Sequence, residues 1–492
     1  MSFSDYTLVL KNDGTLWGCG RNDYGQLSLG DTRSRTTFTK IITNTNDVKL
    51  IHCGNEHTLI LKNNGTLWAC GWNKFSQLGL GDTNNKNVFT IIGINSGNIK
   101  EVYLGGGHTL ISKNDGTLWG SGYNDFGQLG LGDVTGRNTF TQIITNTDDI
   151  KSVYCACDNM FVLKNDGTLW GSGYNGYGQL GLEDYTNRTT LAQITSNIND
   201  IKSVYCGGNY SFILKNDGTL WGCGDNQYGQ LGLGEDRNSK TTFIKITTNV
   251  DNIKSVYCGQ HHTLILKNDG TLWACGYNGE GQLGLGDKNN RTTFTQITTN
   301  VDNIKSVYCG FNHTLILKND GTLWGCGHNY YGQLGLGDFT NRATFTQITT
   351  NTDDIKCFAN DYNAPNIIKI YDSKIGYTET LDTNNFRNIP KDSVKTLKVL
   401  YTMPENSTIH CLISFDKKQT WKTFDGLNWN TISDISPENI ILNCMSIGTL
   451  NQLNKNNLIS GGFTGDLDFK IAMKTNDKTV TSSITKIYIE YE

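Results

Sequence analysis

Seven tryptophans recur at a nearly constant spacing through the first two thirds of the 492-residue chain. The spacings are 51, 51, 51, 51, 52 and 51 residues, and each residue lies in a Gly-Thr-Leu-Trp-(Gly/Ala)-(Cys/Ser)-Gly segment: Trp17, Trp68, Trp119, Trp170, Trp221, Trp273 and Trp324. A fixed period of this kind is the sequence signature of a repeat architecture. We therefore expect seven copies of one structural unit in this part of the chain.

Each unit contains four short segments with the composition of β-strands. In the last unit they are IKSVYC, HTLILK, GTLWGCG and TFTQIT, rich in β-branched and aromatic residues and bounded by Gly, Asn and Asp. The Lys-Asn-Asp-Gly between the second and third segments is a strong hairpin signal. Four strands in each of seven units predict an all-β seven-bladed β-propeller over residues 1–361.

The two ends of the repeat region predict how the ring closes. The first unit lacks its IKSVYC-type segment, and the chain adds a copy of it, Asp354–Phe358, after the seventh unit. We expect the first blade to take two strands from each end of the propeller, with Phe345–Ile348 as the second late strand. Such closure removes exposed sheet edges.

The unit resembles the repeat of the regulator of chromosome condensation family. The resemblance rests on Cys-Gly-x-x-His-Thr-Leu-Ile-Leu and Trp-Gly-x-Gly-x-Asn-x-x-Gly-Gln-Leu-Gly-Leu-Gly-Asp, which recur through residues 1–358. It implies a seven-bladed propeller. Members of this family include a nucleotide exchange factor, a plant photoreceptor, a secreted β-lactamase inhibitor and modules of ubiquitin ligases, so the fold leaves the function open.

Strand direction assigns the loops to two faces. The Gly-x-x-His loops and the Gly-x-Asn-x-x-Gly-Gln loops open on one face, which we call face A, and the Lys-Asn-Asp-Gly turns open on face B. The face B turn is almost invariant among the repeats, with Asn64 as its one departure, whereas the face A loops vary widely. Large aromatic and charged residues at variable loop positions are typical of binding hot spots.

Face A is therefore the predicted partner-binding surface; the alternative is that these loops drift because nothing selects them. The candidate residues are Arg21, Asp23, Trp72, Lys74, Tyr123, Asp125, Tyr174, Asp225, Gln227, Tyr277, Phe311, His328 and Tyr330. The β-lactamase inhibitor of the family is similar in using an aromatic-rich propeller face.

Four other rows of the repeat are interpreted as structural. One is an aromatic row that we expect to pack under the face A loop: Tyr24, Phe75, Phe126, Tyr177, Tyr228, Glu280 and Tyr331. The recurrent histidines share one position with Tyr6, Asn159 and Tyr210, which favours a loop-bracing hydrogen bond over a metal or catalytic ring. Most of the 14 cysteines occupy two rows where Leu or Ser also occurs, so we expect reduced, buried thiols.

Several classes of function are disfavoured. We find no nucleophile elbow, P-loop or zinc-protease helix, no Cys-x-x-Cys pair and no spaced carboxylates of a calcium loop, so we expect no enzyme, cofactor or metal. The net charge of −4 without a basic stripe disfavours nucleic acid. No run is apolar enough for membrane insertion. Repeat sequence starts directly after Met1–Asp5, so we expect no signal peptide.

The repeats stop near Asp361, and residues 362–366 have the composition of a short linker. Residues 367–492 contain several candidate short strands and no strong helix, which predicts a small β-sandwich domain. The segment from Ser414 to Trp429 resembles a module near the ends of tail and baseplate-associated proteins in phages of Gram-positive bacteria. Trp421 and Trp429 form a second candidate site, for stacking on sugar rings; the alternative is a hairpin core.

These observations favour a non-enzymatic binding protein in a phage tail or tail-like particle. It would be assembled in the cytoplasm, become part of the virion and recognise a bacterial surface glycan or protein through face A. The C-terminal domain would dock, form a homo-oligomer or add a contact. The alternative is a protein–protein interaction module or enzyme inhibitor, and a guanine-nucleotide exchange factor is third, because the repeats are nearly uniform and no basic tail precedes them.

Overall fold

The structure is a computed structural model of the chain, and it divides into two compact units, Met1–Asn363 and Ala364–Glu492. It describes residues 4–358 apart from 43–47, 95–98, 145–146, 148 and 197. Beyond residue 358 it describes only the backbone of short strands. The division between the units lies inside the linker predicted for residues 362–366.

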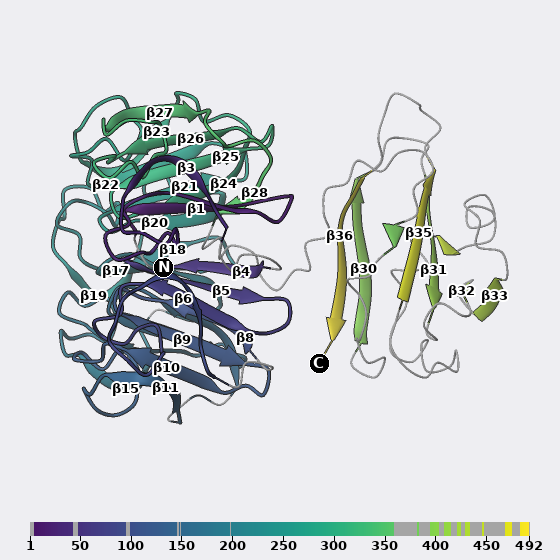
Figure 1. The fold of residues 1–492 in the computed structure, drawn as a ribbon, viewed down its shortest axis with the longest axis horizontal. Helices are drawn as coiled ribbons and strands as arrows, with labels where there is room; N and C mark the ends of the chain where they lie inside the picture. Colours follow the sequence, from purple (N-terminus) through teal and green to yellow (C-terminus); the bar gives the residue numbers. More distant parts are fainter. Residues whose placement is uncertain are drawn as a thin grey trace. The chain divides into compact units, whose positions relative to one another are not determined.

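The first unit consists, within its described residues, of seven four-stranded antiparallel sheets, the blades of a propeller (Figure 1). Blade 1 contains β28 (Ile355–Phe358), β1 (Tyr6–Lys11), β2 (Leu16–Gly20) and β3 (Arg35–Ile41) in that spatial order. Blade 2 contains β4 (Val48–Cys53), β5 (His57–Lys62), β6 (Leu67–Gly71) and β7 (Lys86–Ile91). Blade 3 contains β8 (Ile99–Leu104), β9 (His108–Lys113), β10 (Leu118–Gly122) and β11 (Arg137–Ile143).

The other four blades follow the same order. Blade 4 contains β12 (Ile150–Cys155), β13 (Asn159–Lys164), β14 (Leu169–Gly173) and β15 (Arg188–Ile194). Blade 5 contains β16 (Ile201–Cys206), β17 (Tyr210–Lys215), β18 (Leu220–Gly224) and β19 (Lys240–Lys245). Blade 6 contains β20 (Ile253–Cys258), β21 (His262–Lys267), β22 (Leu272–Gly276) and β23 (Arg291–Ile297). Blade 7 contains β24 (Ile304–Cys309), β25 (His313–Lys318), β26 (Leu323–Gly327) and β27 (Arg342–Ile348). The predicted seven-bladed propeller is thus confirmed.

The ring closes differently from the prediction. Only β28 comes from the late end, and it pairs with β1 in the register Val9↔Phe358 and Leu10↔Cys357. The prediction of two strands from each end is wrong, because β3 already supplies the outer strand of blade 1 and β27 is the outer strand of blade 7. Each repeat supplies its own outer, fourth strand. The first repeat therefore lacked only its inner strand, which β28 supplies.

The hydrophobic core lies between neighbouring blades. The second strand of a blade is buried on both faces, as in β25, whereas the outer strand β27 is only partly buried. Residues of two blades meet in each cluster; for example, Val9 and Phe38 of blade 1 pack with Leu315 and Leu323 of blade 7. The first strands of successive blades from β4 to β24 contact one another, which places them around the propeller axis.

The second unit also contains antiparallel strands. One sheet contains β29 (Leu381–Asp382), β35 (Asp468–Lys474), β31 (Thr408–Ser414), β32 (Trp421–Phe424) and β33 (Trp429–Ile432), and β34 (Met445–Ser446) pairs with β31. A separate pair is formed by β30 (Val394–Thr402) and β36 (Ser483–Tyr491). Side-chain packing in this unit lies outside the described residues, so the β-sandwich stays a prediction.

Candidate functional site

The uniform face B turn has a structural cause. In blade 1 the backbone N–H and the hydroxyl of Thr15 both donate to Asp13 Oδ1, at 2.8 and 2.7 Å. Trp17 Nε1 donates to Thr15 Oγ1 at 2.8 Å, and the Lys11 ammonium lies 4.4 Å from the centre of the Trp17 ring. The same relay recurs in every blade, with Asn64 accepting in blade 2. Its chemistry fixes the residue types, so this turn is expected to be invariant whatever the protein binds.

The face A loop has a fixed frame as well. In blade 1 Asn22 Oδ1 accepts from the Leu27 N–H at 2.9 Å, and its amide donates to the carbonyl of Asp31 at 3.0 Å. Asp31 in turn pairs with Arg35 at 2.7 Å. The frame does not use the side chains at positions such as Arg21 and Asp23. Those positions can vary without loss of the fold, and they are the ones predicted to bind.

Aromatic rings from four successive blades form a continuous chain on face A, which we call the aromatic arc. Neighbouring ring centres are 4.6 to 6.2 Å apart along the order Tyr24, Trp72, Phe75, Tyr123, Phe126, Tyr174 and Tyr177. Tilted and edge-to-face pairs at such distances attract one another and hold the rings rigid. Arg21 extends the arc, since its guanidinium lies 5.5 Å from the ring centre of Tyr24 and 5.1 Å from that of Tyr331.

The arc mixes a predicted binding row with a predicted structural row. Tyr24, Phe75, Phe126 and Tyr177 were expected to pack beneath the loop. Phe75 and Tyr177 are instead 36% and 37% exposed, and Phe75 lines a cavity. The structural interpretation of this row is wrong for Phe75, because its ring packs edge-to-face with Trp72 and tilted against Tyr123 of the next blade instead of under its own loop.

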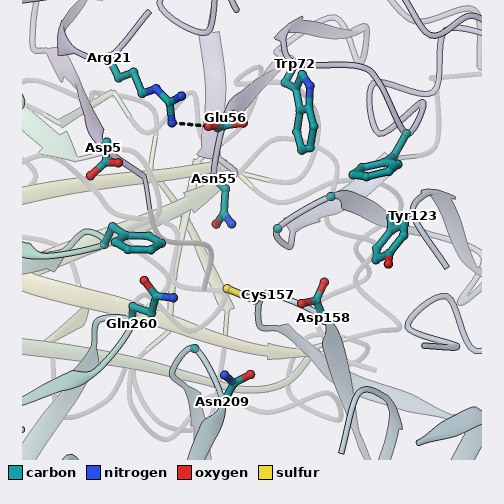
Figure 2. A pocket seen from close by; sticks show the side chains of 15 residues that line it. Asp5, Arg21, Asn55, Glu56, Trp72, Tyr123, Cys157, Asp158, Asn209 and Gln260 are labelled. Carbon is teal, nitrogen blue, oxygen red and sulfur yellow. Dashed lines mark hydrogen bonds and ion pairs between the residues drawn. The ribbon is translucent and has the colours of Figure 1, made fainter. Parts of the chain in front are cut away.

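A cavity of about 440 Å³ lies where the face A loops of different blades converge, and we call it the central cavity (Figure 2). Both predicted loop families contribute to it, which confirms that they open on one face. Its lining residues are Asp5, Arg21, Asn55, Glu56, Trp72, Phe75, Gly106, Gly107, Tyr123, Cys157, Asp158, Gly208, Asn209, Gln260 and Phe311. Figure 2 shows Trp72 and Tyr123 on one side and Asp5 and Gln260 on the other.

The polar groups of the central cavity are unevenly paired. The Arg21 guanidinium donates to Glu56 and forms an ion pair of 2.8 Å with Asp23. Burial raises the pKa of the Glu56 carboxyl, against the lowering effect of Arg21. Burial alone raises the pKa of Asp158 to about 6, and no cation lies against that carboxyl among the described residues. Burial also raises the pKa of the Cys157 thiol to about 12.

The structure brings together some of the predicted residues. Arg21, Trp72, Tyr123 and Phe311 line the central cavity. Lys74 and Asp125 line a second hollow of about 400 Å³ that shares Phe75 and Tyr123 with the first. Since the two hollows share a wall, one partner can contact both.

The other predicted residues lie apart from these hollows. Tyr174 belongs to the aromatic arc, Tyr277 contacts Tyr228 at 5.0 Å between ring centres, and His328 stacks with Tyr330 at 6.3 Å. Asp23 and Gln227 are exposed. Asp225 is buried, because it accepts from the Gln230 amide at 2.9 Å and from the Gln227 N–H at 3.0 Å, and so it braces its loop. The side chains of Trp421 and Trp429 lie outside the described residues.

The candidate set did not include several residues of the central cavity. Glu56, Asp158, Asn209 and Gln260 belong to the variable Gly-x-x-His loops, from which Phe311 alone was a candidate residue. Variability alone could have identified them, because the Gly-x-x-His loops vary as much as the Gly-x-Asn loops. Phe75 carried no such signal, since an aromatic residue stands at its repeat position in six of the seven units.

Three of the four recurrent histidines, His57, His262 and His313, connect neighbouring blades, whereas the His108 ring is buried without a hydrogen-bond partner among the described residues. His57 Nε2 lies 3.1 Å from Thr109 Oγ1 of the next blade, and His313 Nε2 lies 3.4 Å from Thr7 Oγ1 across the closure. Where tyrosine replaces histidine, the Tyr6 hydroxyl donates to the carbonyl of His57 at 2.7 Å. Burial lowers the pKa of His57 to about 3, so its imidazole is neutral. The predicted hydrogen bond was one that braces a loop, and the one observed joins neighbouring blades instead.

The described part of the chain lacks two further classes of feature, metal-binding clusters and membrane-spanning helices. No group of three or more His, Cys, Asp or Glu side chains there is placed to hold a metal ion. Among the same residues no helix has the length and apolar character to cross a membrane. The twelve described cysteines are free, and ten of them are buried, as expected for packing positions.

Family comparisons agree with this geometry. Residues 93–364 match the RCC1-like domain, and residues 13–61 and 64–112 match the regulator of chromosome condensation (RCC1) repeat. The chain is 31% identical over 350 residues to the Ultraviolet-B receptor UVR8 of Arabidopsis thaliana, covering 69% of this chain and 78% of the receptor. It is 34% identical over 310 residues to the X-linked retinitis pigmentosa GTPase regulator of Mus musculus, covering 60% of this chain and 30% of that protein.

Solved structures give the same fold. The crystal structure of yeast RCC1 (Prp20) bound to Kap60 superposes with a TM-score of 0.62 at 20% identity, over 72% of this chain and 86% of that one. Human WBSCR16 gives a TM-score of 0.60 at 20% identity, over 70% of this chain and 94% of that one. The family matches end at residue 364, so the resemblance of the C-terminal region to phage modules stays a prediction.

Proposed function

This chain belongs to the RCC1-like family, and from that premise we propose that it is a non-enzymatic binding protein that engages its partner through face A. The family fold supports many functions, so the proposal depends on the site. The observation that carries it is the central cavity with its aromatic arc. Seven repeats share one loop frame, and the side chains that the frame leaves free converge on one hollow.

The chemistry of the central cavity supports binding over catalysis. The Cys157 thiol, with a pKa of about 12, is protonated near neutral pH and is a weak nucleophile. The recurrent histidines are buried and neutral, and His57, His262 and His313 are engaged with threonines of the next blade. Rigid rings and partly desolvated polar groups are the features of a binding hot spot.

Within this class we propose a component of a phage tail or tail-like particle that recognises a bacterial surface glycan or protein. The support is the sequence from Ser414 to Trp429 in the second unit, which resembles tail and baseplate modules. The propeller would contact the surface ligand, while the second unit would dock or oligomerise. The full chain should then sediment with virions or tail-like particles and bind whole Gram-positive cells.

A second candidate is an interaction module for another protein, such as an enzyme inhibitor. It is favoured by the related yeast RCC1, whose structure holds Kap60. The name of the related GTPase regulator makes a nucleotide exchange factor the third candidate. A purified protein or GTPase that binds the full chain tightly, together with no binding to cells, would favour these candidates over a tail component.

The test of face A is the combined variant Trp72→Ala, Tyr123→Ala and Tyr277→Ala. Each ring is partly exposed, so the blades should still fold. The matched control is Ile42→Ala with Ile144→Ala, which removes two side chains that are 82% and 81% exposed and lie beyond the outer strands, on the face B side. We expect the aromatic variant to lose cell or protein binding and the control to retain it; unchanged affinity in the aromatic variant would overturn the proposal.

A further inference from the structure

Asp158 carries a partly buried carboxylate in the central cavity, unpaired among the described residues. It follows β12 in the Gly-x-x-His loop of blade 4, where Ala and Cys stand for the first residues of the motif. Its carboxyl accepts no hydrogen bond from the described residues, and burial is the sole cause that raises its pKa. A carboxylate that is partly withdrawn from water and has no partner is unfavourable, so a ligand that supplies a positive charge would be stabilised there.

An aromatic wall stands beside this carboxyl. Trp72, Phe75 and Tyr123 line the cavity with ring centres 5.0 and 4.6 Å apart. The Asp158 carboxylate helps to raise the pKa of the Tyr123 hydroxyl, after burial and Asp125, which places the two groups close together, as Figure 2 shows. Ring faces attract cations and also pack against methylene chains.

The lining has a surplus of acceptors. Asp5, Glu56 and Asp158 contribute carboxylates, and Gln260 Oε1 is buried with no hydrogen-bond partner. The one cationic side chain among the lining residues, Arg21, is already paired with Glu56 and Asp23. Ammonium and guanidinium groups donate only, whereas each hydroxyl of a neutral sugar donates and also needs donors. The oxygens of a phosphate are acceptors, so a phosphate ligand would need donors throughout.

We propose that the central cavity receives a cationic side chain, lysine or arginine, from a protein partner, with the charge against Asp158 and the methylene stem against Trp72 and Phe75. This inference rests on the proposed function of face A and deepens it by naming what enters the cavity. A protein is favoured over an amino sugar because a straight apolar stem with a terminal charge matches an apolar wall beside one carboxylate.

The repeat supplies a variant that the fold tolerates. The positions equivalent to Asp158 in blades 5 and 7 are Asn209 and Asn312, in the same loop geometry. Asp158→Asn therefore removes the charge and keeps the shape. The matched control is Asp200→Asn, which removes an exposed carboxylate on the face B side, before β16. Its repeat position holds Asn252 in blade 6, whose side-chain oxygen accepts the equivalent hydrogen bond from an asparagine amide, so the fold tolerates this change too.

The test uses the full chain and nonapeptides of Gly and Ser with blocked termini and one central residue: lysine, arginine or acetyl-lysine. Binding is followed by calorimetry and by tryptophan fluorescence, with Trp72→Phe to assign the signal. We expect lysine or arginine peptides to bind about 10- to 100-fold more tightly than the acetyl-lysine peptide, as for a hydrogen bond to a charged group. Asp158→Asn should abolish this preference, and Asp200→Asn should retain it.

A pH series adds a second readout. The titratable and charged groups that face Asp158 are Asp5, Arg21, Glu56, Tyr123, Cys157 and Tyr174. The Asp158 carboxyl has a pKa of about 6, so the preference for the lysine and arginine peptides over the acetyl-lysine peptide should be full at pH 7.5 and weaken below pH 6. Asp158→Asn should show no such dependence on pH.

Equal binding of the acetyl-lysine peptide, or an unchanged preference in Asp158→Asn, would overturn the inference. Tighter binding of glucosamine than of either peptide would overturn it in favour of an amino-sugar ligand. If peptides fail while the triple aromatic variant still loses cell or protein binding, face A remains the binding surface and the cation assignment alone falls. If both fail, the proposed function falls as well.

Discussion

Replacing Asp158 by asparagine should make the propeller more stable at neutral pH. The folded pKa of about 6 exceeds the value of about 3.9 in an unfolded chain. The Asp158 carboxyl thus binds its proton more tightly in the folded chain than in the unfolded chain. The free energy of unfolding therefore falls as the pH rises from about 4 to about 6. Because a tenfold change in proton affinity is worth about 1.4 kcal/mol, the ionised carboxylate costs the fold up to about 3 kcal/mol at pH 7.5. Asn cannot ionise, so Asp158→Asn should recover that amount.

The assay is thermal unfolding of the full chain, followed by calorimetry at pH 7.5 and pH 4. An entropy of unfolding of about 2.1 cal/mol/K per residue implies that the variant melts about 3–5 °C above the natural chain at pH 7.5. The difference should vanish at pH 4, where Asp158 is protonated in the fold. Asp200→Asn, which alters an exposed carboxylate on the face B side, should change the melting temperature little at either pH. A variant of equal or lower stability at pH 7.5 would refute the reasoning.

Three other outcomes are expected. Phe358→Ala, in the closing strand β28, should lower the free energy of unfolding of the full chain in urea by about 3–5 kcal/mol, since Phe358 is 3% exposed and packs in the cluster between blades 7 and 1. A loss of stability no larger than that caused by replacing an exposed residue would contradict this closure. The ring protons of His57, His108 and His262, whose pKa burial lowers to about 3, should show no titration by NMR between pH 5 and pH 8. The Cys53 and Cys155 thiols, whose pKa burial raises to about 12, should resist iodoacetamide at pH 8 until urea unfolds the chain, as mass spectrometry would record.

The propeller could be predicted because the sequence of each repeat determines its own local structure. The Asp13–Thr15–Trp17 relay and the Asn22–Asp31–Arg35 frame are short-range, so their residue types recur at fixed spacing. The closure could not be derived in the same way. Whether β3 or β27 completes blade 1 depends on the pairing of strands far apart in the chain, and both segments carry the same strand pattern.

The candidate site shows the same division. Variation at Trp72 and Tyr123 pointed to face A, and the structure places both in one cavity. The burial of Asp225 could not be predicted from the comparison of repeats. A carboxylate at a variable position gives the same sequence pattern whether it faces a ligand or accepts a hydrogen bond from the Gln230 amide. The exposure of Phe75 likewise depends on rings from the next blade, which no single repeat encodes.

The two readouts on Asp158 connect stability with binding. Asn209 and Asn312 show that the loop accepts an uncharged residue of the same shape, so the frame does not require a carboxylate in blade 4. Ionised Asp158 lowers stability at neutral pH, and a ligand cation would remove most of that penalty on binding. The free energy that Asp158→Asn returns to the fold should therefore be lost from affinity for the cationic peptides. If Asp158→Asn gains stability without losing affinity for the cationic peptides, stability and binding are independent at this position. The Asp158 carboxylate then has no role in recognition.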